Sequence, residues 1–164
     1  MLYWRDFLQW IEGSALGNLI RDSGVWTYGA INLAHIIGIA TLFGSIVVLD
    51  LRLLGWRRDV DLTRLASVIT PVAATGFGIA AVSGICLLAT NGSDYIGNPF
   101  VPIKFVAVFL GLCNALVLSR LSGWKARDRR ELIPRERLRL SLAGGASLVC
   151  WLTAVGAGRM IGYW

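Results

Sequence analysis

The chain has 164 residues, 55% of them hydrophobic, and a formal net charge of +6. Its length predicts one domain, and its hydrophobic fraction exceeds that of an ordinary soluble domain. The positive charge does not indicate nucleic-acid binding: twelve of the sixteen Lys and Arg residues lie in two segments, 52–64 and 120–139, without a basic groove interleaved with aromatic residues. We therefore expect no nucleic-acid partner.

The first segment, residues 1–24, is predicted to form an amphipathic helix that is too polar to span a membrane. Its apolar residues can share one broad face, opposite the charged ones. Such a helix suits the outer membrane interface, with Trp4 and Trp10 at headgroup level, and it equally suits packing across the outer end of a helix bundle. Gly13 and Gly17 favour a break within it.

Four long apolar runs follow, at approximately 25–50, 67–90, 99–122 and 138–163. Each is long enough for a helix to cross the hydrocarbon layer, and each is too long and too rich in Gly and Ala for a barrel strand. The sequence therefore predicts an all-α integral membrane protein: a four-helix antiparallel bundle over residues 25–164 with an N-terminal interfacial amphipathic helix. Pro71 is expected either to kink the second helix or to mark its first turn.

The loop charges predict the orientation of the bundle. Loops rich in Lys and Arg stay in the cytoplasm, which places the segments 52–64 and 120–139 inside and both termini outside. Asp94 is the only charged residue in the loop 91–97, and the absence of Lys and Arg from this loop is typical of an outward loop. The basic segment 120–139 is also suited to anionic lipid headgroups or to an acidic partner.

Small residues recur at four-residue spacing in three of the runs and predict close helix packing, either within the bundle or against another subunit. The three series are Ala30, Ala34 and Gly38; Gly76, Ala80 and Gly84; and Ala146, Cys150, Ala154, Gly158 and Gly162.

His35 is the only histidine, and it lies inside the first run. Tyr28, Asn32 and His35 are spaced i, i+4, i+7 and so share one helix face. A polar stripe on a spanning helix should face protein or water rather than lipid. Lys104 and Arg159 lie at a similar outer depth on other helices. Each either snorkels to the headgroups or points inward and completes a pocket with the stripe.

Such a pocket would suit one of two redox cofactors. Haem b would use the His35 imidazole as an axial ligand and the two cations for its propionates, although a second histidine would have to come from another subunit. A quinone needs only hydrogen-bonding groups and an apolar slot. The alternative is purely structural: His35 bonds a neighbouring helix through Tyr28, Asn32 or Asn114.

Other activities are less well supported by the residues. A metal site other than haem is disfavoured, because one histidine without an intramembrane carboxylate makes a poor ligand set. No Asp or Glu lies at the centre of a run, which disfavours proton or ion transport. Asp50 stands at the inner end beside Arg52, where an ion pair or a helix-end role suffices. Motifs of soluble enzymes are absent.

Three motifs resemble those of a bacterial inner-membrane family of small four-span proteins classed as a domain of unknown function. They are the run from His35 through Gly44 with its continuation Asp50–Gly55, the segment Tyr95–Lys104, and the ending Gly158–Tyr163. The resemblance implies the four-helix topology and a location in the bacterial inner (plasma) membrane. It singles out His35, Asp50, Arg52, Lys104 and Arg159, and it implies no activity.

Together these features predict a small polytopic membrane protein without catalytic activity of its own. We expect a subunit of a larger membrane assembly or a homo-oligomer, in contact with the lipid bilayer, with a polar site formed by His35, Tyr28, Asn32, Lys104 and Arg159. The alternative is a redox module that binds haem b or quinone at His35.

Overall fold

The computed structural model describes residues 2–164, with side chains from residue 4 onward, and this part of the chain is helical without strands. In chain order the elements are α1 (Leu2–Glu12), α2 (Ala15–Asp22), α3 (Val25–Leu54), α4 (Leu62–Thr90), the 3-10 helix η1 (Gly92–Tyr95), α5 (Phe100–Arg120), α6 (Ser122–Ala126) and α7 (Pro134–Ile161).

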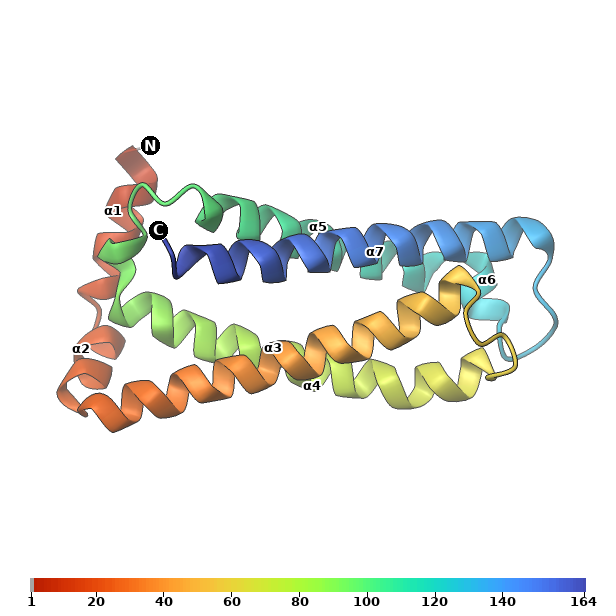
Figure 1. Ribbon diagram of the computed structural model, residues 1–164, viewed down its shortest axis with the longest axis horizontal. Coiled ribbons are helices and arrows are strands. Elements are labelled where there is room, and N and C mark those ends of the chain that lie inside the picture. The colour runs from red at the N-terminus through yellow and green to blue at the C-terminus, as the bar shows by residue number, and fades with distance from the viewer. Residues whose placement is uncertain (1) are drawn as a thin grey trace.

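Four of these helices, α3, α4, α5 and α7, are long and apolar enough to cross a membrane. They run alternately in opposite directions, and both termini lie at the same end of the bundle (Figure 1). This arrangement confirms the predicted all-α membrane bundle. We call the end that carries α1, α2 and η1 the cap end, and the end that carries the loops 55–61 and 121–133 the basic end.

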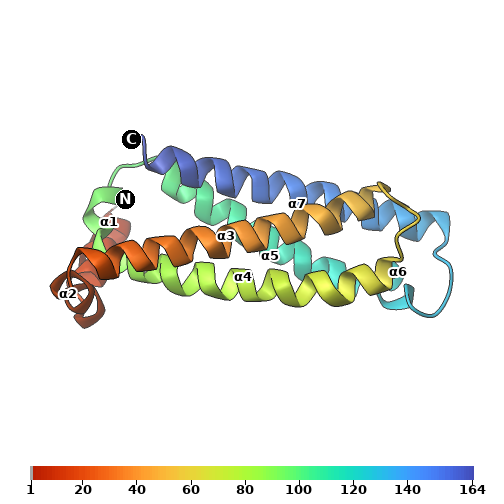
Figure 2. The same cartoon turned by 60° about the horizontal axis from the view of Figure 1, so that its bottom comes forward.

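The bundle is built from two helical hairpins (Figures 1 and 2). Helix α3 packs against α4 and helix α5 packs against α7, while contact between α3 and α7 joins the two pairs. Helix α3 comes closest to α7 toward the basic end, where Gly144 lies against the backbone of Asp50. Toward the cap end the two hairpins stand apart in both views.

The α3–α4 hairpin is held by direct contact between backbones. A Cβ atom added at Gly38 would lie 2.6 Å from the Ala80 nitrogen, and one added at Gly76 would lie 2.6 Å from the Leu42 nitrogen. Side chains cannot intervene at such a crossing, so only glycine fits. The close packing predicted from the small-residue series of these two helices is confirmed here.

The α5–α7 hairpin packs through a large side chain instead. Trp151 of α7 is 5% exposed and lies over Gly111 of α5. Ala146, a member of the small-residue series predicted for this helix, is exposed, whereas Ala154 is buried. Only part of the series therefore faces the rest of the bundle, because steps of four residues drift by roughly 40° each around a helix.

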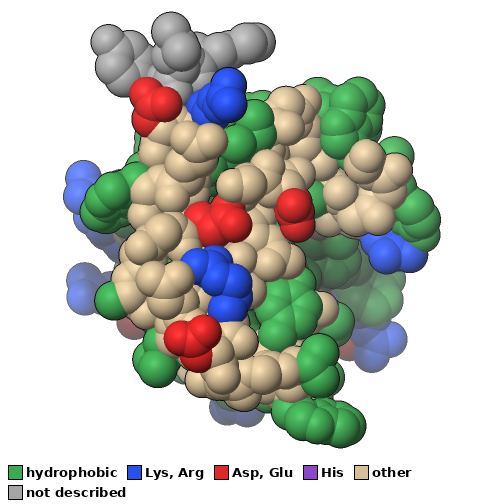
Figure 3. Space-filling view, turned by 90° about the vertical axis from the view of Figure 1, so that its left-hand side faces the viewer, with side chains coloured by type: hydrophobic (Ala, Val, Ile, Leu, Met, Phe, Trp, Pro, Cys, Tyr) green, Lys and Arg blue, Asp and Glu red, His purple; other side chains and the backbone are tan. Residues whose placement is uncertain are grey.

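Helices α1 and α2 lie across the cap end (Figure 1). This is the second of the two alternatives predicted for this segment, packing across the end of the bundle. Arg21 fastens them: its guanidinium donates to the carbonyls of Ala89 and Thr90 at the end of α4 and to the carbonyl of Glu12. In turn the Glu12 carboxylate accepts from the Ser93 amide at 2.5 Å. Figure 3 shows charged side chains of both signs across this end and hydrophobic ones around its rim.

Helix α4 begins before the second apolar run. Asp61 accepts a hydrogen bond from the Arg64 amide at 2.7 Å and so caps a helix that starts at Leu62. Pro71 therefore lies inside the helix rather than in its first turn.

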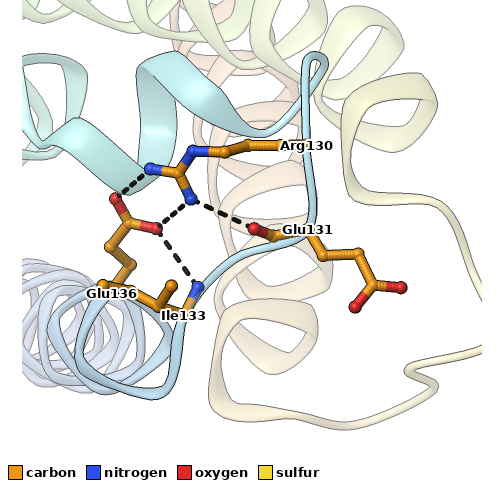
Figure 4. A network of polar contacts seen from close by, with 4 residues as sticks. All are labelled: Arg130, Glu131, Ile133 and Glu136. Atoms are coloured by element: carbon orange, nitrogen blue, oxygen red, sulfur yellow. Dashed lines mark hydrogen bonds and ion pairs between the residues drawn. The ribbon is translucent and has the colours of Figure 1, made fainter.

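At the basic end, Arg130 fixes the start of α7 (Figure 4). Its guanidinium forms two hydrogen bonds to the Glu136 carboxylate, at 2.8 and 2.9 Å, and a third to the Glu131 carbonyl. The same carboxylate accepts from the Ile133 amide. The paired carboxylate raises the pKa of Arg130 further above its ordinary value.

Candidate functional site

His35 is fixed at one ring nitrogen. It lies half-buried on α3, facing α4, with Nδ1 2.9 Å from the Ala80 carbonyl oxygen and 3.1 Å from the Ser83 hydroxyl oxygen. Ser83 donates its own hydroxyl hydrogen to the Ile79 carbonyl at 2.5 Å. Because both partners of Nδ1 therefore accept, Nδ1 carries the proton. In the neutral ring, Nε2 is then the hydrogen-bond acceptor.

The second ring nitrogen, Nε2, has no hydrogen-bond partner among the described residues. The ring lies directly on the backbone of α4, since a Cβ atom added at Gly84 would come within 3.0 Å of the His35 Cε1 atom. Glycine at this position thus lets the imidazole sit close to α4. The anchored Nδ1 sets the direction of the ring and leaves Nε2 available to another group.

Lys104 comes to the same region from the other hairpin. Its half-buried side chain runs along α7 and lies 3.6–3.7 Å from the Cβ position of Gly158. Its ammonium is near enough to His35 to act electrostatically on the imidazole. His35 on α3 and Lys104 on α5 therefore lie within electrostatic range of each other, with an acceptor on one and a donor on the other.

Tyr28 and Tyr95 lie nearer the cap end than this pair, with Tyr95 in η1 itself. Tyr28 is two helical turns nearer the cap than His35, on the same side of α3, and the Tyr95 phenol in η1 is near enough to Tyr28 to interact with it electrostatically. Burial, with smaller contributions from Tyr28 and Asp94, raises the pKa of the Tyr95 phenol. Tyr95 therefore stays protonated at neutral pH, and both tyrosines offer hydroxyl groups to this region.

Arg159, which the sequence placed in the pocket, points elsewhere. Its exposed side chain stacks over the Tyr163 ring, 4.5 Å from the ring centroid, and hydrogen-bonds to the Tyr163 hydroxyl. The local partner lies four residues further along the chain, so Arg159 is engaged at the end of α7 rather than with His35. Of the two cations proposed for the pocket, only Lys104 is directed into the bundle.

Asn32 is also outside the cluster, because its side chain is exposed on α3. The buried face of α3 includes Gly38 and Leu42. On a helical projection, His35 and Tyr28 lie roughly 40° and 60° from the middle of this face, and Asn32 lies roughly 100° away. The three residues span about 60° of the helix surface. A face of this width includes both half-buried residues and an exposed one.

Asp50 is a buried polar residue for which the sequence predicted either an ion pair with Arg52 or a role at the helix end. It is 2% exposed, and its Oδ2 atom has no hydrogen-bond partner among the described residues. The expected pairing with Arg52 does not form, because the Arg52 guanidinium donates to the carbonyls of Val60 and Arg58. No periodic signal marked Asp50 as buried, since α3 is apolar on nearly every side.

No set of three or more His, Cys, Asp or Glu side chains gathers as a metal site within residues 2–164. A scan against protein-family models finds no match for this chain. Comparisons with curated proteins and with solved structures likewise find no significant match. The residues of the site are therefore the basis for a functional interpretation.

Proposed function

We propose that this protein is a non-catalytic membrane subunit that holds the headgroup of a quinol or quinone between its two hairpins, at His35 and Lys104. The observation that carries the proposal is an anchored imidazole whose Nε2 has no partner among the described residues, with the Lys104 ammonium of the other hairpin held along Gly158 within electrostatic range of it. A quinol presents a hydroxyl to the first and a ring oxygen to the second.

The surroundings of the pair suit a ligand of this class. Because Nδ1 is anchored to α4, the imidazole does not have to reorder when Nε2 accepts a hydrogen bond, which reduces the entropic cost of binding. The long apolar helices supply surface for the isoprenoid tail. The residues named here supply binding and orientation, while electron transfer would belong to a partner subunit.

Binding can be measured with a short-chain ubiquinol titrated into the purified protein. His35→Ala and Lys104→Met should each weaken binding about tenfold, the value of one good hydrogen bond. Asn32→Ala is the matched control, because Asn32 lies on the same helix with an exposed side chain, and it should bind like the wild type. Equal affinity of wild type and His35→Ala would contradict the proposal.

Haem b is the second candidate at this site. A histidine whose Nδ1–H bonds a backbone carbonyl is held as metal-ligating histidines are held, and this favours Nε2 as an axial ligand. His35 is the only histidine in the chain, so a second imidazole would come from another copy. A Soret band that purifies with the wild type and disappears in His35→Ala would favour haem over quinol.

A role within a larger assembly is supported by glycines on the outer surface of the bundle. A Cβ atom added at Gly44, Gly78 or Gly156 would meet nothing within 4 Å, so each offers a place for another helix to approach closely. Gly78→Leu should then reduce co-purification with a partner or a second copy while leaving the monomer folded. Unchanged assembly would argue against this surface.

The family, location and orientation also belong to the proposal. We infer a protein of the bacterial inner-membrane family that the chain resembles, with the cap end outside and the basic end in the cytoplasm. The concentration of Lys and Arg at the basic end supports this orientation. Single cysteines placed at Ser93 and Ala126 in a cysteine-free background test it: labelling of Ala126→Cys from outside would invert the assignment.

A further inference from the structure

The loop between α3 and α4 is held in place by hydrogen bonds at both of its ends. Gly55 ends α3 with a left-handed φ of 105°, and the Trp56 amide donates back to the Leu51 carbonyl at 2.9 Å. These two features form a Schellman-type helix end. Asp61 then caps α4. The loop residues between Gly55 and Asp61 are thereby held in a defined arrangement.

A groove of about 310 Å³ opens beside this loop. Its lining is Val48, Arg52, Trp56, Arg57, Val60 and Leu65. Four of these residues are apolar, two are arginines and none is acidic. Val48 and Leu65 belong to the two helices, while the arginines and Trp56 lie at or beyond the end of α3. The groove therefore has an apolar part along the helices and a cationic part at the basic end.

Arg52 is held by the loop and keeps one guanidinium nitrogen free of hydrogen bonds within the described part of the chain. Its guanidinium donates through Nε to the Val60 carbonyl at 2.7 Å and through Nη2 to the Arg58 carbonyl at 3.3 Å. Nη1 makes no hydrogen bond to the described residues. Arg57 is exposed and has only a 3.5 Å ion pair with Asp59, which is weak in water. Both arginines thus keep donor capacity for an anion.

We infer that this groove is a binding site for an anionic phospholipid. The phosphodiester would lie against Arg52 and Arg57, the 61%-exposed Trp56 indole would lie at the headgroup level, and an acyl chain would follow Val48 and Leu65. A soluble phosphate would leave the apolar part of the groove unused. A zwitterionic lipid would complement the groove less well, because its lining has two arginines and no acidic residue, and Asp59 pairs with Arg57 only weakly from outside it.

A second groove at the same end makes a useful contrast. It is larger, about 760 Å³, and five arginines and four acidic residues line it. Its near balance of charge gives no comparable preference for an anion. The lipid site is therefore assigned to the smaller groove, and this assignment is independent of the site at His35.

The test is native mass spectrometry of the purified protein with phosphatidylglycerol and phosphatidylcholine at equal concentration. Wild type should retain phosphatidylglycerol in preference. Arg57→Gln should reduce its retention about fivefold, and Arg52→Gln by a similar factor, as expected for one basic residue near an anionic lipid. Arg52→Lys, which keeps the charge but not the planar fork, should fall in between.

Arg129→Gln is the matched control, because Arg129 is exposed at the basic end and does not line the groove. It should retain lipid as the wild type does. Arg57 is exposed, so its replacement should not disturb folding. Equal retention of both lipids, an equal loss in Arg129→Gln, or displacement of the lipid by millimolar inorganic phosphate would each overturn the assignment.

Discussion

The two hairpins of the bundle bring their helices together in different ways. In α3–α4 the backbones touch at Gly38 and Gly76, where an added Cβ atom would lie 2.6 Å from a backbone nitrogen. In α5–α7 the glycine at position 111 faces the Trp151 side chain instead, and an added Cβ atom would lie 3.0 Å from it. The first contact cannot adjust, whereas the second can.

This difference bears on the site, because each hairpin contributes one of its two central groups. His35 is held by the rigid hairpin, with Nδ1 fixed to the backbone of α4. Lys104 belongs to the hairpin that packs through side chains, and its flexible stem lies along Gly158. We therefore expect the imidazole to stay fixed while the ammonium adjusts to a ligand.

Gly38→Ala should have the largest effect on stability. The new methyl group would collide with the backbone of α4, which cannot move without separating the helices. We expect a loss of about 3 kcal/mol in the free energy of unfolding, measured by circular dichroism during denaturation in mixed micelles. Gly44→Ala is the control on the same helix, because a Cβ atom there meets nothing within 4 Å.

Gly111→Ala should cost less, about 1 kcal/mol, because the Trp151 side chain can shift by a few tenths of an ångström. The same unfolding assay compares it with Gly38→Ala. Equal losses in the two variants would show that the hairpins do not differ in rigidity.

Ser83→Ala tests how firmly His35 is held. The change removes one of the two acceptors of Nδ1 and leaves the Ala80 carbonyl. We expect a loss of about 0.6 kcal/mol, typical of an interhelical hydrogen bond in a membrane, with the quinol affinity reduced less than in His35→Ala. A loss of affinity as large as that of His35→Ala would mean that Ser83 itself contacts the ligand.

The smallest effect concerns the cap and depends on pH. Hydrogen bonds from Ser93, with the charge of Arg21 in support, hold the pKa of Glu12 below its ordinary value of 4.5. A lowered carboxyl pKa stabilises the folded state above about pH 4.5, and this contribution is lost as the pH falls through the lower value. Hydrogen exchange at the Ser93 amide, expressed relative to its intrinsic rate at each pH, should rise as the pH falls over that range in the wild type.

Glu12→Gln is the matching variant, since its amide does not titrate. Its exchange at Ser93 should be faster than that of the wild type at neutral pH and should not show the additional rise in acid. A rise of the same size in both proteins would place the pH dependence elsewhere in the cap.

The sequence predicted the fold well because length and hydropathy alone mark a membrane helix. The beginning of α4 was missed, because its first turn contains Arg64 and extends beyond the apolar run. The packing of α3 against α4 also followed from the sequence, since backbone contact requires glycine. In α7 the small-residue series follows the buried face only in part, since Ala154 is buried and Ala146 is exposed.

The site was only partly predictable. His35 and Lys104 stood out because polar side chains are rare in such helices. Hydropathy could not tell which side of α3 is buried, so it grouped exposed Asn32 with His35 and left Asp50 undetected as a buried residue. The orientation of Arg159 depends on a local partner, Tyr163, which its depth in the membrane does not reveal.

Nitrogen NMR can test directly whether His35 presents an unprotonated Nε2 to a ligand beside Lys104. Since the chain has one histidine, protein labelled with ¹⁵N-histidine gives nitrogen NMR signals from this ring alone. We predict the Nδ1–H tautomer, with the Nε2 signal moving when short-chain ubiquinol is added and the Nδ1 signal nearly unchanged. A ring protonated at Nε2, or an Nε2 signal that does not change when the quinol is added, would show that Nε2 does not accept a hydrogen bond from the ligand.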